Sequence, residues 1–342
     1  MKKLVPKLFL LLIPILIYYF VVYMTDPFNI FHYDHVRITE AADNSNYIKT
    51  RYVIENPDKY NAFVLGSSRV ANIPEVGLPK ELDGETLRWY NMETAMASVK
   101  DNCEALKTLL QNGVDVKYVV LGIDEISMYR TYEQACSELM SMPYQKYEEN
   151  PLKFYYQYLK VKPKLKLLLE AYDQGTDDIR NAEMLYEYGV LLPNIDLAIP
   201  EKKDYMLKSM GCGEYTRTDS PFQGISALEE IRDICHENGI CLVVYTSPIQ
   251  GSTYREAASK GYFDFLVDAS KVVGYYNFSG LNEYTTNQTF YFDSSHFVPY
   301  VGLKMEEVMF SGEKISDISA FGAYINEENS QELVDYLAKE LE

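Results

Sequence analysis

Four short, largely apolar or aromatic runs constrain the fold of this chain more than any other feature. They occupy residues 62–66, 88–91, 117–122 and 240–245. Runs of this length and composition are typical of strands that are buried on both faces of a parallel sheet. Such a sheet needs helices on both of its faces, because neither face can be left open to water.

Two amphipathic segments supply the helices that this arrangement needs. Residues 98–112 and 225–238 each place apolar side chains on one helical face, and each ends at Asn-Gly, which favours a left-handed helix stop. Helices that alternate with buried strands indicate βαβ units with right-handed crossovers. The sequence therefore predicts an α/β fold, doubly wound around a mostly parallel sheet, formed by residues 61–129 and 221–342.

The alternation of helix and strand fails between residues 130 and 220. This segment is rich in tyrosine, lysine, leucine and glutamate, and it contains no run that resembles the four predicted strands. It ends near Ser220-Pro221, which favours a loop that returns the chain to the sheet. We therefore expect residues 130–220 to form an inserted, mainly helical cap.

The N-terminal segment predicts a membrane anchor. Residues 4–24 are almost unbroken apolar or aromatic, and about twenty helical residues cover a hydrocarbon core of roughly 30 Å. Lysines gather at its start, which places the N-terminus in the cytoplasm and the rest of the chain outside. A cleaved signal peptide is the alternative, but its apolar region is usually shorter and ends in small residues. We expect a single-pass anchor over residues 1–25 and a juxtamembrane stalk over residues 26–60.

Charge and cysteine content exclude several classes of function. The chain carries 50 acidic and 32 basic residues, which argues against a nucleic-acid partner, because phosphate binding depends on clustered lysine and arginine. Neither a P-loop nor a dinucleotide-binding glycine motif occurs. The five cysteines form no CxxC pair and have no histidine at zinc spacing. We expect no metal, no cofactor and mostly reduced thiols, although one disulfide stays open for an exported chain.

Polar residues follow the predicted strands and mark a candidate site. Ligands of an open parallel sheet bind outside the carboxyl ends of its strands. The residues at or just after these ends include Ser68, Arg69, Asn91, Gly122 and Asp124. We expect them to lie along one edge of the sheet.

A short motif near the end of the predicted domain supplies the rest of a catalytic group. Asp293 precedes His296 by three residues, so a tight turn can bring the carboxylate to the imidazole and fix its tautomer. A serine hydroxyl becomes a nucleophile when such an oriented base takes its proton. An isolated Gly-Ser-Ser is more often a turn or a helix cap. Its occurrence together with Asp293 and His296 predicts that Ser68 is a nucleophile.

These two motifs resemble those of the SGNH (GDSL-like) hydrolase superfamily. Gly66-Ser67-Ser68 corresponds to the Gly-Asp-Ser of the family's first block, and Asp293 with His296 to the Asp-x-x-His of its last block. The resemblance covers roughly residues 60–125 and 240–310. It is closest to the membrane-anchored, extracytoplasmic branch that includes the lipoteichoic acid D-alanylation protein and the alginate O-acetylation proteins.

The sequence departs from the family pattern in two places. The oxyanion-hole glycine of the second block has no clear counterpart after Asn91, and the asparagine of the third block falls near Asp124. A carboxylate cannot donate a hydrogen bond unless it is protonated, and it repels a developing oxyanion. Either Asp124 pairs with Arg69, leaving backbone donors for the oxyanion, or the activity is weak or absent. An ion pair of Arg69 with Asp124 or Glu125 is favoured over the alternative, in which Arg69 orients an anionic substrate.

The resemblance implies a serine esterase or acyltransferase that acts by a ping-pong mechanism. Its implied substrates are O-acetyl or D-alanyl esters of a cell-envelope polysaccharide or teichoic acid, and its implied partner is a membrane-bound O-acyltransferase. One alternative is a catalytically degenerate SGNH domain that binds glycan or assists such a transferase. Another is a lipase-like esterase in which residues 130–220 form an apolar lid.

Overall fold

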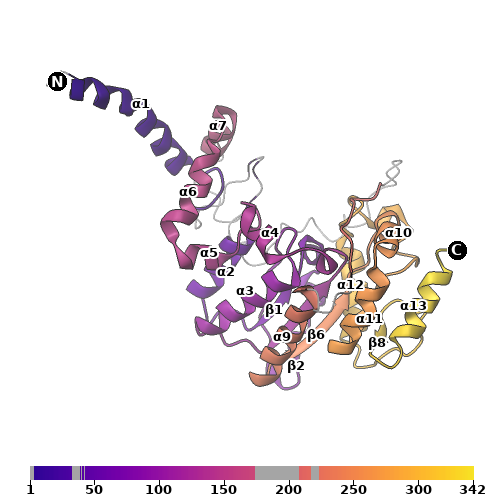
Figure 1. Ribbon diagram of the computed structural model, residues 1–342. Helices are drawn as coiled ribbons and strands as arrows, with labels where there is room; N and C mark the ends of the chain where they lie inside the picture. Colours follow the sequence, from indigo (N-terminus) through magenta and orange to yellow (C-terminus); the bar gives the residue numbers. More distant parts are fainter. Residues whose placement is uncertain (1–3, 33–38, 40, 42, 174–207, 217–222) are drawn as a thin grey trace.

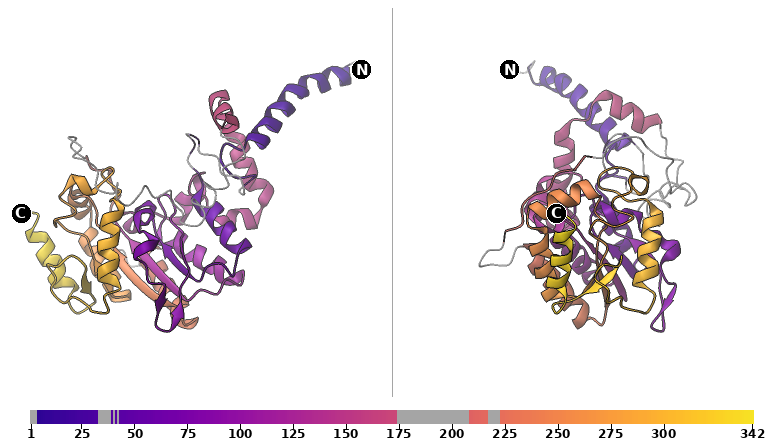
Figure 2. Two further views of the ribbon diagram at one scale, coloured as in Figure 1. Left: turned by 180° about the vertical axis from the view of Figure 1, so that it is seen from behind. Right: turned by 90° about the vertical axis from the view of Figure 1, so that its right-hand side faces the viewer.

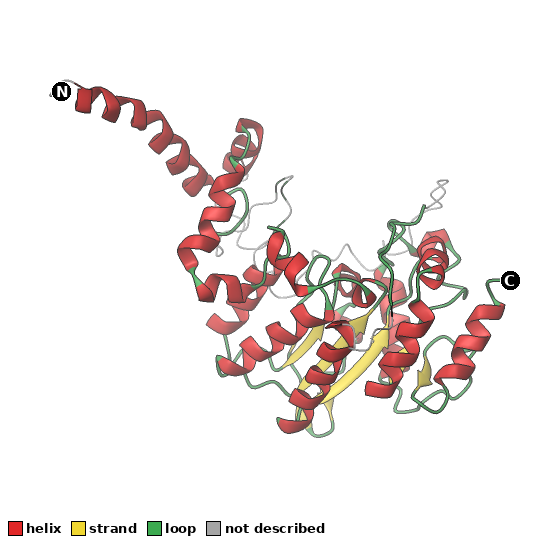
Figure 3. Ribbon diagram, in the orientation of Figure 1, coloured by secondary structure: helices red, strands yellow, loops and turns green. Residues whose placement is uncertain are grey.

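The computed structural model describes residues 4–32, 39, 41, 43–173, 208–216 and 223–342, with the side chains of residues 4–11 outside this description. Its centre is a six-stranded sheet that lies between helical layers (Figure 1, Figure 3). The strand order is β4-β1-β5-β6-β7-β8. The strands are β1 (Ala62–Leu65), β4 (Trp89–Asn91), β5 (Tyr118–Ile123), β6 (Cys241–Thr246), β7 (Tyr275–Asn277) and β8 (Ala323–Ile325).

All neighbouring strands of this sheet pair in parallel except β7 and β8, which are antiparallel. A separate hairpin joins β2 (Glu81–Leu82) to β3 (Glu85–Thr86). The predicted α/β class with a mostly parallel sheet is therefore confirmed. The sequence did not predict β7 and β8. Each has three residues, like β4, but only the first and third are buried, so neither forms the fully buried run that marked β4.

Helices cover both faces of the sheet and bury its alternating side chains. Phe63 and Leu65 of β1 pack into the core beneath α3 and α9, whereas Ala62 and Val64 pack into the core beneath α12. This alternation follows from the two-residue period of a strand. The helices are α1 (Leu4–Thr25), α2 (Ser45–Glu55), α3 (Val99–Gln111), α4 (Tyr132–Ser137), α5 (Tyr144–Glu149), α6 (Pro151–Val161), α7 (Leu165–Asp173), α9 (Gln223–Glu237), α10 (Gly251–Ser259), α11 (Tyr262–Val272), α12 (Pro299–Met309) and α13 (Ser330–Lys339).

Helix α2 corrects the expectation of a juxtamembrane stalk over residues 26–60. Asn44 caps this helix by accepting a hydrogen bond from the Tyr47 N–H, and Tyr47, Ile48 and Val53 are fully buried. The helix packs against α3 and α5. Its buried face also contains Lys49 and other polar residues, so the sequence shows no apolar stripe there and the helix was missed.

The described part of the expected cap, residues 130–173, contains the helices α4 to α7. Residues 174–207 and 217–220 of the expected cap lie outside the described residues. Within the described part of the chain, α6 and α7 are joined by a short turn at residues 162–164, and α7 packs against α1 near its C-terminal end (Figure 1, Figure 2). We name this connected pair of helices, residues 151–173, the α6–α7 hairpin for its connectivity alone, since the two helices are not packed on each other along their lengths. The cap boundaries of 130 and 220 stay a prediction.

Helix α1 extends away from the α/β domain (Figure 2). Among the described residues, no helix has both the length and the apolarity that crossing a bilayer requires. The anchor over residues 4–24 therefore stays a prediction.

The five cysteines are free thiols, as the sequence predicts.

Candidate active site

Ser68 lies where β1 ends and a short 3-10 helix, Ser68–Asn72, begins. Ser67 caps this helix, because its Oγ accepts a hydrogen bond from the Arg69 N–H at 3.3 Å. At Gly66 a Cβ would stand 2.3 Å from a methyl group of Val70, so only glycine lets the short helix fold back onto the strand. The half-buried Ser68 is thus held at the carboxyl end of the sheet, where its hydroxyl can be reached.

A tight turn holds Asp293 and His296 together. The Asp293 Oδ1 accepts hydrogen bonds from the backbone N–H groups of Ser295 (2.7 Å) and His296 (2.8 Å). The flanking residues Tyr291 and Phe297 form an antiparallel bridge, and both are fully buried. The tip of the turn is therefore anchored in the core, and the carboxylate is fixed beside the imidazole.

This turn places His296 next to Ser68, although the two residues are 228 positions apart in the sequence. His296 Nδ1 lies 2.8 Å from Asp293 Oδ2, and His296 Nε2 lies 2.8 Å from Ser68 Oγ. An ionised carboxylate can only accept, so Nδ1 carries the proton and Nε2 accepts from the serine hydroxyl. The three predicted catalytic side chains thus form one hydrogen-bonded chain in the order that a serine nucleophile requires.

The charge of Asp293 supports this proton arrangement. Partial burial would raise the pKa of Asp293, but the hydrogen bond and charge of His296 and the two backbone N–H groups outweigh it and lower the pKa to about 2. The carboxylate is therefore ionised throughout the neutral range. The side chains of His296 and Asp293 are 28% and 47% exposed, so water and a substrate can approach them.

A fully buried ion cluster lies beneath this group. The Arg69 guanidinium, 1% exposed, donates to Asp124 Oδ2 at 2.9 Å and to Glu125 Oε1. Burial alone would lower the pKa of Arg69, but Glu125 and Asp124 outweigh it and raise that pKa. Burial raises the pKa of Glu125, and Arg69 opposes the rise. The predicted pairing of Arg69 with these carboxylates is confirmed.

Asp124 uses both carboxylate oxygens inside the protein. Oδ1 accepts from the backbone N–H groups of Ile126 (2.9 Å) and Ser127 (3.2 Å), and Oδ2 accepts from Ser67 Oγ (2.5 Å) as well as from Arg69. These contacts join the carboxyl ends of β1 and β5. Asp124 therefore occupies a structural position below the site and does not face the place where an oxyanion would form beside Ser68.

Asn91 and Gly122 also lie below the site, which corrects their assignment to the oxyanion region. Asn91 Nδ2 donates to the Val70 carbonyl at 2.8 Å, and its Oδ1 accepts from the Glu93 N–H at 2.9 Å. Gly122 is buried within β5, and a Cβ there would stand 2.6 Å from Val70. Both residues support the short helix that begins at Ser68. Sequence position gave the correct edge of the sheet, but it could not separate the residues that face solvent from those that face inward.

Lys49 also helps to position the candidate site, and the sequence did not reveal this role. This buried side chain of α2 donates to the Glu93 carbonyl at 2.9 Å and pairs with the Glu93 carboxylate at 2.8 Å. The next residue, Thr94, donates its backbone N–H to the Gly66 carbonyl at 3.2 Å. Helix α2 thereby holds the loop after β4 against the turn that carries Ser68. No motif marks Lys49, because its role depends on a contact between distant segments.

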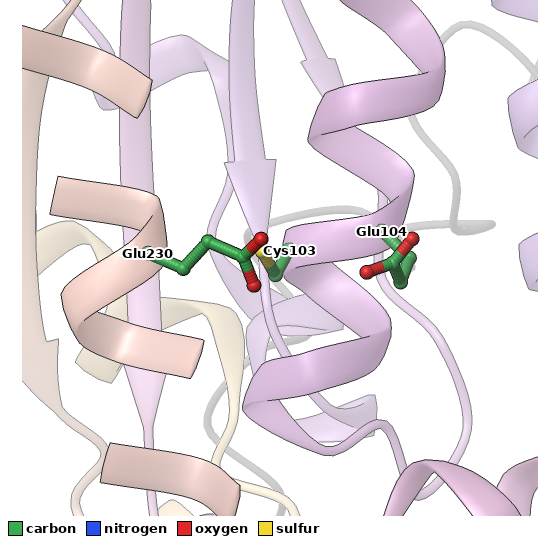
Figure 4. Close-up of side chains that lie close together, drawn as sticks. All are labelled: Cys103, Glu104 and Glu230. Carbon is green, nitrogen blue, oxygen red and sulfur yellow. The ribbon is translucent and has the colours of Figure 1, made fainter. Parts of the chain in front are cut away.

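One group of described residues has the donor atoms for a metal ion: Cys103 and Glu104 of α3 and Glu230 of α9 (Figure 4). Lys100 pairs with both of these carboxylates at 2.7 Å, and Lys107 contacts both as well. Burial, with Glu230, raises the pKa of the Cys103 thiol to about 12. The arrangement is an ion-pair network between two helices, in which lysines already neutralise the carboxylates.

Comparison with known proteins gives no family for this chain. No protein-family model matches it, and no curated protein matches its sequence significantly. The chemistry of the site is therefore inferred from its own geometry.

Proposed function

We propose that the chain is an SGNH-type serine esterase or acyltransferase with Ser68 as the nucleophile. The observation that carries this proposal is the hydrogen-bonded chain from Ser68 through His296 to Asp293. Ser68 Oγ attacks an acyl carbonyl while His296 Nε2 takes its proton, and the imidazolium then gives that proton to the leaving alcohol. Water or an acceptor hydroxyl attacks the acyl-serine in a second half-reaction, with His296 again as the base.

Backbone groups are the proposed oxyanion donors. The Ser68 N–H donates to no acceptor among the described residues, and it adjoins the nucleophile. The loop of residues 93–96, which α2 holds beside the Gly66–Ser68 turn, is the proposed second source. The inward contacts of Asp124 remove the charge repulsion that motivated a catalytically degenerate domain, so we favour an active enzyme.

The proposed setting is the outer face of a cell membrane. Helix α1 exposes apolar side chains, including Leu16 at 65% and Phe20 at 63%, and contact with lipid would remove them from water. The proposed substrates are O-acetyl or D-alanyl esters of an envelope polysaccharide or teichoic acid. A membrane-bound O-acyltransferase is the proposed partner. Both follow from the resemblance to SGNH proteins.

Hydrolysis of p-nitrophenyl acetate by the full chain in detergent tests the chemistry. The Ser68→Ala variant should lose at least about 10³-fold in rate. Ser67→Ala is the matched control, because Ser67 Oγ contacts Asp124 and lies outside the hydrogen-bonded chain. An equal rate for the wild type and Ser68→Ala would exclude the proposed nucleophile.

A further inference from the structure

Exposed apolar side chains are concentrated in two neighbouring parts of the molecule. Of the sixteen large hydrophobic residues that are exposed in the described part of the chain, eight lie on α1 and six on the α6–α7 hairpin. The six on the hairpin are Leu152, Tyr156, Val161, Leu165, Leu169 and Tyr172, which are 49–82% exposed. Soluble proteins rarely gather so many exposed apolar side chains without a partner.

The same hairpin carries a local positive charge in an acidic chain. Residues 151–173 contain five lysines and two acidic residues, Glu170 and Asp173, which gives a net charge of +3, whereas the whole chain has a net charge of −18. Lys160, Lys162 and Lys164 are exposed around the turn of the hairpin. Lys166 pairs with Glu170. A cationic and apolar surface fits a surface that is itself anionic and apolar, as an anionic bilayer is.

A cleft at the turn between α6 and α7 combines both properties. It has a volume of about 370 Å³, and its lining includes Lys162, Lys164 and Lys166 together with Phe28 and Leu167. Ammonium groups next to apolar side chains suit a phospholipid, whose headgroup phosphate would contact the lysines and whose acyl chains would begin at the apolar side chains.

The hairpin is a fixed part of the molecule and adjoins α1. Phe154 and Tyr158 of α6 are buried in a core that also contains Phe28 and Tyr47. The Tyr18 hydroxyl of α1 donates to the Pro163 carbonyl at the hairpin turn, at 2.9 Å. Both views in Figure 2 show α7 beside the C-terminal end of α1. Any membrane that α1 contacts therefore lies next to the exposed face of the hairpin.

We propose that the α6–α7 hairpin docks on an anionic lipid bilayer, with its apolar side chains at the acyl boundary and its lysines on the headgroup phosphates. This inference shares with the proposed function only the placement of the chain at a membrane, and it does not depend on the chemistry of Ser68. Two points of attachment, α1 and the hairpin, would fix the orientation of the α/β domain relative to the membrane.

Tryptophan fluorescence of the full chain in vesicles tests the docking. Trp89 is the only tryptophan and is 3% exposed, so it gives a constant background. Leu165→Trp places a probe on the hairpin, and Val76→Trp is the matched control on the α/β domain, since Val76 is 65% exposed. The vesicles contain brominated phosphatidylcholine, alone or with phosphatidylglycerol, and a flotation assay of wild type reports attachment through α1.

We expect the brominated lipid to quench the fluorescence of the added tryptophan in Leu165→Trp, and to do so more strongly when phosphatidylglycerol is present. The fluorescence of the added tryptophan in Val76→Trp should not be quenched. Adding Lys160→Gln, Lys162→Gln and Lys164→Gln should shift the equilibrium toward the undocked hairpin by about fivefold per lysine. The control carries Lys80→Gln, Lys208→Gln and Lys339→Gln at other exposed positions, and its docking equilibrium should be unchanged. A chain that floats with the vesicles but shows equal quenching at both probes, or none, overturns the inference and leaves α1 attachment standing. That outcome would point to a protein partner instead.

Discussion

Two neighbouring serines at the end of β1 have opposite environments. Ser68 Oγ contacts His296 in a half-exposed group, whereas Ser67 Oγ contacts Asp124 in a cluster that water does not reach. Both groups contain a serine and a carboxylate. Ser68 is connected to its carboxylate through an imidazole, which can take and return a proton near neutral pH. Ser67 instead donates directly to Asp124, and the other partner of that carboxylate, the Arg69 guanidinium, cannot take a proton. One group is therefore suited to chemistry and the other to holding the strand ends together.

Removal of the carboxylate from the exposed group should give the largest effect. Asp293→Asn keeps the shape but leaves no anion to hold the His296 Nδ1 proton, so Nε2 is no longer fixed as the acceptor. We expect the hydrolysis rate to fall by about 10²–10⁴-fold with little change in stability. Steady-state rates and thermal unfolding of the same sample check this. A rate within about threefold of wild type would mean that Asp293 does not orient the base.

Removal of the Arg69 guanidinium from the buried cluster should lower the free energy of unfolding. Arg69→Met leaves the carboxylates of Asp124 and Glu125 buried without a counter-ion, which costs about 3–5 kcal/mol. Denaturant unfolding measures the loss. The control Arg255→Met changes an exposed arginine and should cost less than about 0.5 kcal/mol. Equal losses for the two variants would contradict the structural role of the cluster.

Glu306 extends the comparison to a buried carboxyl group that has no cation. It is 1% exposed, and neither of its carboxylate oxygens has a hydrogen-bond partner among the residues that the structure describes. Burial, with a smaller effect of Glu307, raises the pKa of Glu306 from 4.5 to about 9. A raised carboxyl pKa makes the folded state bind the proton more tightly, so stability is full below about pH 4.5 and is lost as the pH rises toward 9.

Glu306→Gln should therefore stabilise the chain increasingly with pH, by on the order of 2–4 kcal/mol at pH 7. Unfolding midpoints of both proteins between pH 5 and 9 measure the gap. The neighbouring Glu307→Gln, at an exposed position paired with Lys304, should show no such trend. A constant gap across this range would mean that Glu306 is ionised in the folded protein.

Ser67→Ala should give the smallest effect. The variant loses the hydrogen bond to Asp124 and the cap of the short helix, so we expect a cost of about 1–3 kcal/mol in stability. The rate of hydrolysis per folded molecule should stay within about threefold of wild type. Thermal unfolding and active-site titration separate the two quantities. A large loss of rate in a folded sample would mean that Ser67 takes part in the chemistry.

The sequence predicted the fold class, four of the six strands and the association of Ser68, His296 and Asp293. These features are encoded locally, in apolar runs and in the Asp-x-x-His turn. It did not predict helix α2 or the contact from Lys49 to Glu93, because the buried face of α2 is partly polar and its partners come from a distant loop. Nor could it separate the outward-facing Ser68 from the inward-facing Asn91, Gly122 and Asp124, since all of them lie at or just after the carboxyl ends of strands.

Mapping of a fluorophosphonate adduct tests the central claim most directly. The probe is incubated with the full chain in detergent, and mass spectrometry of the digested protein locates the modified serine. We predict one adduct, on Ser68, with no labelling in Ser68→Ala and continued labelling in Ser67→Ala. An unlabelled wild-type chain, or an adduct that persists in Ser68→Ala, would contradict the assignment of Ser68, His296 and Asp293 as a catalytic group.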